Sequence, residues 1–211
     1  MFNKISNALV LAPHTDDGEL GAGGLINKLI NHNIHVDYMA FSAAEDSVPA
    51  GYQTDVLRSE VIEATKKLGI DSASVDVKKY PVRMLNFHRQ DILDDLIEYR
   101  KRCIPDLVLI PSLNDLHQDH STVANEALRA FKSTTILSYE LPWNNIDFNA
   151  SFYVKLSKEE VNCKCSALSM YNSQSGRQYL NSEFTLSLAR VRGCQIGVEF
   201  AECFEVVRWV V

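Results

Sequence analysis

The sequence predicts an α/β fold in which a mostly parallel β-sheet is flanked by helices on both faces. Short apolar runs alternate with segments of helical periodicity as far as about residue 141, and this alternation is typical of sheets built from strand–helix–strand units. The chain has 211 residues and contains no linker, repeat or low-complexity segment. Because domains commonly have about 100–200 residues, we expect residues 1–211 to form one domain.

The predicted strands are short and mostly apolar. Residues 8–13 and 106–110 are apolar almost throughout, as expected for strands that helices cover on both sides. Further strands are predicted at residues 35–42, 75–80, 135–141 and 152–156, and an apolar stretch ends the chain at residues 204–211. Such a succession of strands with helical crossovers predicts a Rossmann-like sheet.

The predicted helices have apolar residues at helical spacing and recognisable ends. Gly69 is expected to cap the C-terminus of the second helix, and Ser157 with Glu160 forms a capping box at the start of the fifth. The glycines within residues 21–24 are expected to let the first helix pack closely on the sheet. The predicted helices comprise residues 20–33, 55–68, 91–102, 120–131, a segment that begins at residue 158, and residues 182–191.

Charge and cysteine content argue against several classes of protein. The formal net charge is −6, opposite in sign to the basic face of a typical nucleic-acid-binding protein. No apolar run approaches the roughly 18 residues of a membrane span. The five cysteines are an odd number and no secretory signal opens the chain, so we expect free thiols and a cytoplasmic location. A small-molecule partner is expected, and the sequence leaves open whether the chain forms a homo-oligomer.

The first candidate site is the cluster at residues 14–17, which directly follows the first predicted strand. Ligands of parallel sheets bind at the carboxyl ends of the strands. His14 offers a ring nitrogen, and Asp16 and Asp17 offer carboxylate oxygens, which are ligands for zinc, iron or cobalt. Adjacent side chains diverge in a turn, so one carboxylate can bind a metal while the other acts as a general base. Taken alone, the cluster fits a turn that caps the next helix equally well.

The second candidate site, residues 117–120, follows the apolar strand at residues 106–110 and has the sequence His-Gln-Asp-His. Parallel strands place both clusters at the same edge of the sheet. A site could therefore combine His14, one aspartate and one histidine of the second cluster. Two histidines and one carboxylate with open positions are typical of a catalytic metal site. A solvated turn at a helix start is the alternative for this cluster taken alone.

With both clusters in place, the sequence resembles the PIG-L/LmbE family of N-acetylglucosaminyl deacetylases. The family motif His-Pro-Asp-Asp-Glu, followed by a Gly-rich helix start, corresponds to residues 14–24, and the motif His-Pro-Asp-His corresponds to residues 117–120. Thr15 stands where the family usually has Pro. Gly18 stands where it usually has Glu, with Glu19 one position later. The resemblance continues at later landmarks and covers nearly the whole chain.

The resemblance implies a role for each residue of the site. The residues implied to bind the metal, usually zinc with iron or cobalt as alternatives, are His14, Asp17 and His120. Asp16 is implied to be the general base, and His117 to stabilise the oxyanion and to protonate the leaving amine. Asp119 is implied to orient His117. Arg58 is implied to hold the sugar or its attached group.

The implied activity is that of a zinc-dependent hydrolase that removes the acetyl group from an N-acetylglucosamine-type amino sugar or glycoconjugate. One alternative is an amide-linked thiol-sugar conjugate as the substrate, and another is a metal-stabilised sugar-binding protein without turnover. A nucleotide-binding protein of the same fold is disfavoured because the first loop is rich in acidic residues. Trp143 could stack on a sugar ring or pack against the protein, and Gln174 could pack or line the site.

Overall fold

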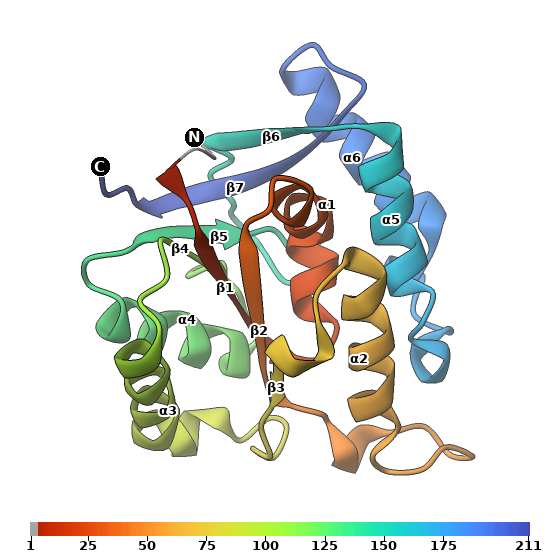
Figure 1. Cartoon of the computed structure of the whole chain (residues 1–211). Coiled ribbons are helices and arrows are strands. Elements are labelled where there is room, and N and C mark those ends of the chain that lie inside the picture. The colour runs from red at the N-terminus through yellow and green to blue at the C-terminus, as the bar shows by residue number, and fades with distance from the viewer. Residues whose placement is uncertain (1–3) are drawn as a thin grey trace.

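A seven-stranded sheet with the strand order β3-β2-β1-β4-β5-β7-β6 forms the centre of the fold. The structure, a computed structural model, describes residues 4–211 (Figure 1). The strands are β1 (Asn7–His14), β2 (His35–Ser42), β3 (Val75–Val77), β4 (Leu107–Pro111), β5 (Thr135–Tyr139), β6 (Phe152–Leu156) and β7 (Phe200–Arg208). Neighbours among β1 to β5 pair in parallel, whereas β7 pairs antiparallel with β5 and β6. The predicted mostly parallel sheet is confirmed.

Helices cover both faces of this sheet (Figure 1). The α-helices of the described residues are α1 (Asp17–Asn31), α2 (Val56–Leu68), α3 (Arg89–Arg102), α4 (Gln118–Ala130), α5 (Lys158–Leu168) and α6 (Ser182–Gln195). Short 3-10 helices occur at Glu45–Ser47, Ser72–Ser74, Leu85–His88, Asn172–Gln174 and Gln178–Leu180. Apolar residues of α1, α2, α5 and α6 form a core on one face, and those of α3 and α4 form a second core on the other.

The apolar run of β1 is explained by this double cover. Val10 and Ala12 pack into the core that contains α1, whereas Leu9 and Leu11 pack into the core that contains α3 and α4. All four side chains are fully buried, because successive residues of a strand point to opposite faces. Burying a side chain such as Leu or Val stabilises a fold by about 1.5–3 kcal/mol. The central strand is therefore stabilised by packing on both faces, and its carboxyl end gives the following loop a fixed starting point.

Three helices begin earlier than the sequence predicted; α3 begins at Arg89 instead of residue 91, and the other two carry the polar clusters. α1 begins at Asp17 and α4 begins at Gln118, whereas we predicted starts at residues 20 and 120. The unpaired N–H groups and the dipole of a helix N-terminus favour acidic and hydrogen-bond-accepting side chains, so polar residues that resemble a loop form the first turns instead. Both polar clusters consequently lie at junctions between a strand and a helix.

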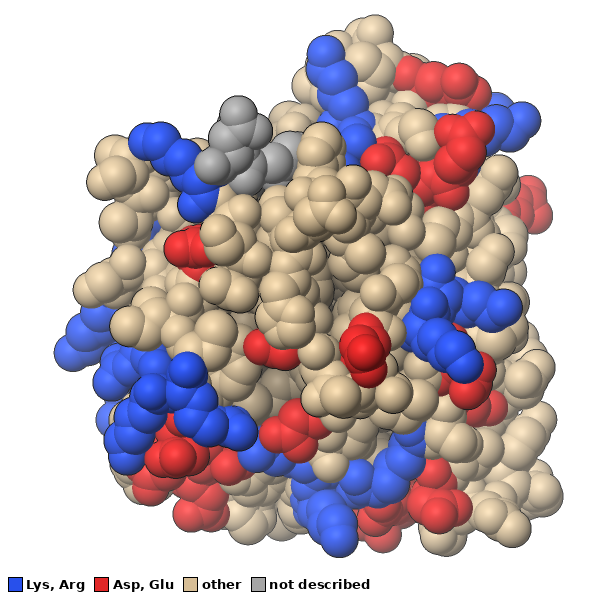
Figure 2. All heavy atoms as spheres, in the orientation of Figure 1, with Lys and Arg blue, Asp and Glu red and all other residues tan. Residues whose placement is uncertain are grey.

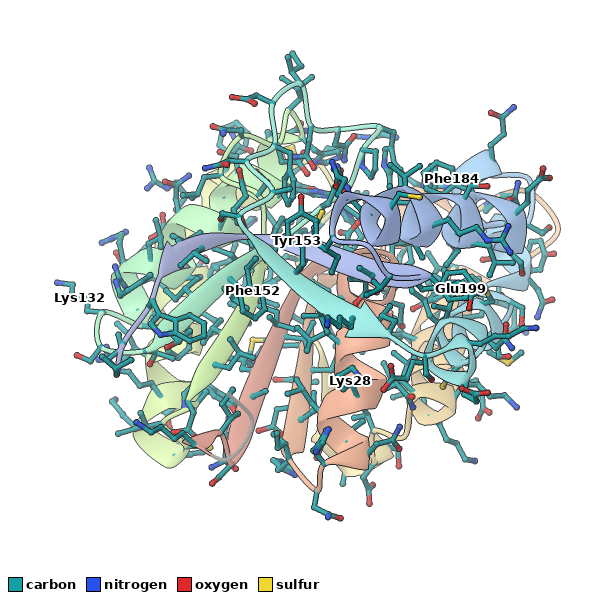
Figure 3. The ribbon with its side chains drawn as sticks, turned by 90° about the horizontal axis from the view of Figure 1, so that it is seen from above. Lys28, Lys132, Phe152, Tyr153, Phe184 and Glu199 are labelled. Carbon is teal, nitrogen blue, oxygen red and sulfur yellow. The ribbon has the colours of Figure 1, made fainter. Side chains whose placement is uncertain are left out.

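The C-terminal strand also begins earlier than predicted. β7 lies between β5 and β6, with α6 packed along it (Figure 3), and it starts at Phe200 instead of residue 204. Glu202 interrupts the apolar pattern from which the start of this strand was predicted. Its side chain is buried and accepts hydrogen bonds from the backbone N–H groups of Gly24 and Leu25 at 2.8 and 2.7 Å. Lys164 Nζ pairs with the same carboxylate at 2.8 Å. A strand that contains a buried carboxylate with all its partners inside the protein cannot be predicted from apolar residues alone.

On the face of the molecule that Figure 2 shows, basic and acidic side chains are interspersed and form no large patch of one charge. Among the helices of residues 4–211, none combines the length and the apolar character that crossing a lipid bilayer requires.

The glycines of α1 allow the close packing that the sequence predicted. A Cβ atom on Gly21 would lie 2.2 Å from Cδ2 of Tyr139, well inside van der Waals contact. We expect Gly21→Ala to lower the free energy of unfolding by about 1–3 kcal/mol, because overpacking forces the ring to move. Urea denaturation measures this. Gly176→Ala is the matched control, since its Cβ would meet no atom within 4 Å. Equal stability of the two variants would contradict the packing argument.

Candidate active site

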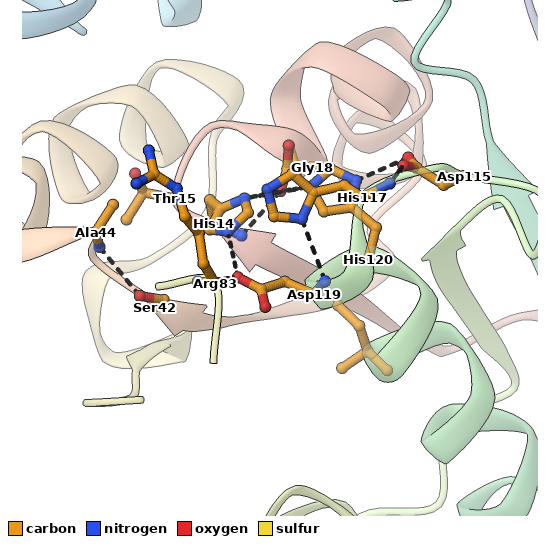
Figure 4. A network of polar contacts seen from close by, with 12 residues as sticks. His14, Thr15, Gly18, Ser42, Ala44, Arg83, Asp115, His117, Asp119 and His120 are labelled. Carbon is orange, nitrogen blue, oxygen red and sulfur yellow. Dashed lines mark hydrogen bonds and ion pairs between the residues drawn. The ribbon is translucent and has the colours of Figure 1, made fainter. Parts of the chain in front are cut away.

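A cavity lies at the carboxyl ends of β1 and β4, where the two polar clusters meet (Figure 4). His14 and Asp17 reach it from the junction of β1 and α1, and His117 and His120 reach it from the start of α4. The ring centre of His14 lies 4.9 Å from that of His117 and 5.1 Å from that of His120. The sheet thus joins two clusters that are about a hundred residues apart, as the order of parallel strands predicts.

Three side-chain atoms form a nearly equilateral triangle in this cluster. Asp17 Oδ2 lies 3.2 Å from His14 Nδ1 and 3.2 Å from His120 Nε2, and the two nitrogens are 3.2 Å apart. Donor atoms around one tetrahedral zinc ion, with bonds of about 2.0–2.1 Å, are about 3.3 Å apart. The residues present therefore fit a zinc ion without rearrangement.

His117 offers a second way to complete a metal site. One nitrogen from each of His14, His117 and His120 lies within 4.8 Å of the others. This three-histidine set is looser than the triangle that Asp17 completes. The shorter and more equal distances favour Asp17 as the third donor, and they leave His117 beside the triangle. Its ring stacks on that of His120 with centres 4.7 Å apart.

Each of the two histidines of the triangle, His14 and His120, contacts a further carboxylate through the ring nitrogen that lies outside the triangle. Asp115 Oδ2 is 2.8 Å from His120 Nδ1, and Asp119 Oδ2 is 3.1 Å from His14 Nε2. Such a contact fixes the orientation of an imidazole and leaves its other nitrogen directed at the metal. His120 Nε2 and His14 Nδ1, the nitrogens left over, are the two that belong to the triangle.

The carboxylate of Asp119 does not have the partner that the sequence suggested. We expected it to orient His117, but it lies against His14 and accepts hydrogen bonds from the backbone N–H groups of Arg83 and Leu85 at 2.6 and 3.1 Å. The reason is that His117 caps the N-terminus of α4, where its Nδ1 accepts the backbone N–H of Asp119 at 3.2 Å. The backbone of Asp119 thus orients His117 while its side chain orients His14.

Charges are strongly coupled within the triangle. Burial alone would lower the pKa of both histidines, but the neighbouring carboxylates outweigh it and raise the pKa of His14 to about 9 and that of His120 to about 10. Burial would raise the pKa of Asp17, yet His120 and His14 hold it far below its usual range. A metal ion bound here would displace the histidine protons, so its binding should weaken as the pH falls.

The two other polar residues of the cluster have pKa shifts in different directions. Burial, together with the neighbouring Asp17, raises the pKa of Asp16 to about 6, and Arg177 opposes this shift. Burial and the two nearby histidines lower the pKa of His117. At neutral pH, Asp16 is therefore a carboxylate that can accept a proton, and His117 is a neutral imidazole.

A family model described as GlcNAc-PI de-N-acetylase (PIG-L) matches residues 9–131. This segment is more than half of the chain and contains both polar clusters. The chain belongs to the PIG-L family. The resemblance noted in the sequence is thereby confirmed.

Solved structures share the PIG-L fold over nearly the whole chain. The conserved protein TT1542 from Thermus thermophilus has a TM-score of 0.81 and 25% identity, with coverage of 98% of this chain and 96% of that one. An N,N'-diacetylchitobiose deacetylase from Pyrococcus horikoshii has a TM-score of 0.78 and 20% identity, with coverage of 98% and 85%. GalB, a 4-carboxy-2-hydroxymuconate hydratase from Pseudomonas putida, has a TM-score of 0.81 and 21% identity, with coverage of 98% of both chains. Because a hydratase also has this fold, the reaction must be argued from the site.

Gly18, one of the two departures from the usual PIG-L motif, is explained by a buried cluster of Tyr38, Tyr171 and Glu19 beneath the loop of the first polar cluster. A Cβ atom on Gly18 would lie 2.6 Å from the hydroxyl oxygen of Tyr38, so a larger residue does not fit there. The hydroxyl groups of Tyr38 and Tyr171 both contact the carbonyl oxygen of Thr15, at 2.8 and 2.7 Å, and both contact the carboxyl group of Glu19. Glu19 and the two tyrosines therefore hold the turn that carries the first cluster.

Proton counting indicates that Glu19 is neutral in this buried cluster. The two phenols make four oxygen–oxygen contacts with Thr15 and Glu19, but they carry only two protons. A protonated carboxyl group supplies a third, so that three of the four contacts can be hydrogen bonds instead of two. Burial raises the pKa of Glu19 to about 8, although the hydrogen bonds from Tyr38 and Tyr171 oppose this.

We expect Glu19→Gln to flatten the pH dependence of stability between about pH 4.5 and 8. The folded-state pKa of Glu19 is raised from 4.5 to about 8, so its contribution is complete below pH 4.5 and is lost as the pH rises through 8. The slope is at most about 1.4 kcal/mol per pH unit. Urea denaturation at pH 5 and pH 8 measures it, with the exposed Glu63→Gln variant as the control. Identical losses in the wild type and in Glu19→Gln would refute a neutral Glu19.

Arg58 has a different place from the one expected. It does not line the cavity. Its Nε pairs with Glu45 at 2.7 Å, and its Nη1 and Nη2 donate to the carbonyl oxygens of Val77 and Lys78 at 2.9 Å each. These bonds fasten the loop after β2 to the end of β3. The sequence-based role of substrate contact is corrected to a structural one, because all three nitrogens are already engaged.

The structure adds residues that the sequence did not indicate. Arg83, Arg177 and Tyr179 line the cavity; the two arginines come from loops and Tyr179 from a short 3-10 helix, none of which has a recognisable motif. Asp115 could have been noticed as another acid beside the second cluster. Trp143, for which two roles were open, lines the cavity and also stacks on Tyr179 with ring centres 4.1 Å apart. Gln174 lines the cavity as well.

Proposed function

We propose that this chain is a metal-dependent N-deacetylase that hydrolyses the acetamide of an N-acetylglucosamine-type amino sugar or glycoconjugate. The observation that carries the proposal is the triangle of His14, Asp17 and His120 with a free carboxylate, Asp16, beside it. A family described as a GlcNAc-PI de-N-acetylase and a fold shared with a diacetylchitobiose deacetylase support the substrate class. The products would be acetate and the free amine.

His14, Asp17 and His120 would hold the metal. Zinc suits this donor set and its 3.2 Å spacings, and iron or cobalt use the same ligand types. A metal ion of this kind polarises a carbonyl group and makes water more acidic. Asp115 and Asp119 would keep the two imidazoles in the orientation that binding requires.

Asp16 would act as the general base. Its carboxylate lines the cavity next to the triangle, and no side-chain hydrogen bond to the start of α1 occupies it. A pKa of about 6 is close to the value at which a base is both ionised and able to accept a proton near neutral pH. Asp16 would take a proton from the attacking water and pass it to the nitrogen of the leaving amine.

His117 would stabilise the oxyanion. Its Nδ1 accepts the backbone N–H of Asp119, so in the neutral ring the proton is on Nε2, which can donate to a developing negative charge. The lowered pKa of His117 keeps the ring neutral. This favours a role as hydrogen-bond donor over the role of acid for the amine.

Acetate release from a panel of acetylated amino sugars tests the proposal. The panel holds free N-acetylglucosamine, its nucleotide-linked and lipid-linked forms, glycosides and an amide-linked thiol-sugar conjugate. We expect release of one acetate per amine from at least one N-acetylated member. Saturable binding of these sugars without any acetate or amine would instead support a sugar-binding protein and would overturn the proposed activity.

A further inference from the structure

Two arginines line the cavity without forming an ion pair. Arg83 and Arg177 both contribute to its wall, yet neither has a carboxylate partner in the described part of the chain. Four other arginines, Arg58, Arg89, Arg129 and Arg192, do pair with glutamates. In a chain with a net charge of −6, two unpaired guanidinium groups at one cavity indicate that a ligand supplies the missing negative charge.

The backbone of Arg83 strengthens this reading. Its φ of 66° lies in the left-handed region, which is unfavourable for most residues and is adopted most readily by glycine or asparagine. In this conformation the backbone N–H of Arg83 donates to Asp119, a bond that does not require the side chain of arginine. The guanidinium group has no partner among the described residues, and Figure 4 shows the side chain extending beside His14. Strain of this kind is concentrated at functional sites.

Arg177 is held in place by aromatic residues. Its Nη1 donates to the hydroxyl of Tyr179, whose ring stacks on Trp143. The guanidinium carbon lies 5.8 Å from the centre of the Tyr179 ring. Asp16 contributes to its electrostatic environment but lies beyond ion-pair distance. A cation that is fixed before the ligand arrives loses less conformational entropy on binding.

We infer that the substrate carries an anionic group, a carboxylate or a phosphate, and that Arg83 and Arg177 bind it in the cavity while the acetamide lies at the histidine cluster. Guanidinium groups form bidentate, charge-assisted hydrogen bonds with both anions. The inference rests on the proposed function, because it describes what the deacetylase would select.

The test compares pairs of substrates that share the acetylated sugar and differ in whether they carry an anionic group. One pair is N-acetylglucosamine 1-phosphate and methyl N-acetylglucosaminide. The other is a carboxylate-bearing N-acetylglucosaminide and its methyl ester. We expect kcat/KM of the wild type to be about 10- to 100-fold higher for a charged member than for its neutral partner. The pair with the larger ratio identifies the anion as phosphate or carboxylate.

Arg83→Asn and Arg177→Gln should each reduce this preference about tenfold or more, mainly through KM. Asparagine tolerates the left-handed backbone and keeps the N–H bond to Asp119. Arg83→Lys should recover part of the preference because it restores the charge. Arg102→Gln, which removes an exposed charge outside this cavity, is the control and should leave the preference intact. Equal ratios in the wild type and in both cavity variants would overturn the inference.

Binding measured without turnover separates this inference from the proposed function. Calorimetric titration of the same ligands into the wild type and the two cavity variants reports affinity even if no acetate is released. Preference for the charged ligands, lost in both variants, would support the anion site although the deacetylase proposal had failed. Absence of any preference for the charged ligand, whether both members of a pair bind or neither does, would overturn the anion site.

Discussion

Replacing Asp16 by asparagine is expected to lower kcat by about 100- to 10,000-fold while the protein keeps its metal. The amide has nearly the same shape as the carboxylate but cannot accept a proton, and general-base assistance is worth about this factor. Asp16 makes no side-chain capping bond to α1, so the substitution removes no helix contact. Acetate release under saturating substrate measures kcat, and metal analysis of the same sample measures occupancy.

Asp46→Asn is the matched control for this variant. Asp46 is an exposed aspartate in the loop after β2, and its change to asparagine alters the net charge equally. We expect its kcat to equal that of the wild type. An Asp16→Asn variant that turns over at the wild-type rate would remove Asp16 from the role of base. One that loses both activity and metal would place Asp16 among the metal ligands instead.

Replacing His120 by alanine is expected to abolish metal binding and to destabilise the fold as well. Loss of one of three donors leaves the site incomplete. The substitution also removes the partner of Asp115, whose carboxylate lies 2.8 Å from His120 Nδ1, and a partner of Asp17. Breaking a buried charged pair costs about 3–5 kcal/mol. Metal stoichiometry and urea denaturation in the presence of a chelator measure the two effects separately.

His117→Ala distinguishes the two candidate donor sets. If Asp17 completes the site, this variant should still bind one equivalent of metal, because no donor atom is removed. It should lose most of its activity, because the oxyanion contact is lost; the cap that His117 Nδ1 provides for α4 is lost with it. Asp17→Asn should then lose the metal. The opposite pattern, with metal lost in His117→Ala and kept in Asp17→Asn, would assign the site to the three histidines.

Much of the fold could be predicted from apolar runs, from the geometry of parallel strands and from the positions of glycines. The apolar runs of β1 and β4 predicted strands that are buried on both faces, and parallel pairing predicted that the segments after them would meet. His14 and His120 do meet, at 3.2 Å. Glycine at residue 21 predicted close packing of α1, and Tyr139 lies where a Cβ atom would be.

The contacts that the sequence did not predict depend on where a helix begins and on the course of loops through the fold. The partner of Asp119 could not be predicted because it depends on where α4 begins, and polar first turns resemble loops. Arg58 was assigned to the substrate from its place in a motif, but the course of the loop after β2 directs it to Glu45. Arg177 reaches the cavity through an irregular segment between Leu168 and Ser182, whose path no periodicity encodes.

The dependence of acetate release on bound metal tests the central claim most directly. The wild-type protein is stripped with a chelator, dialysed and titrated with zinc, while metal content and acetate release from the best substrate of the panel are measured together. We predict that activity is lost on stripping and returns in proportion to zinc up to one equivalent per chain. Undiminished acetate release from protein shown to contain no metal would contradict the account.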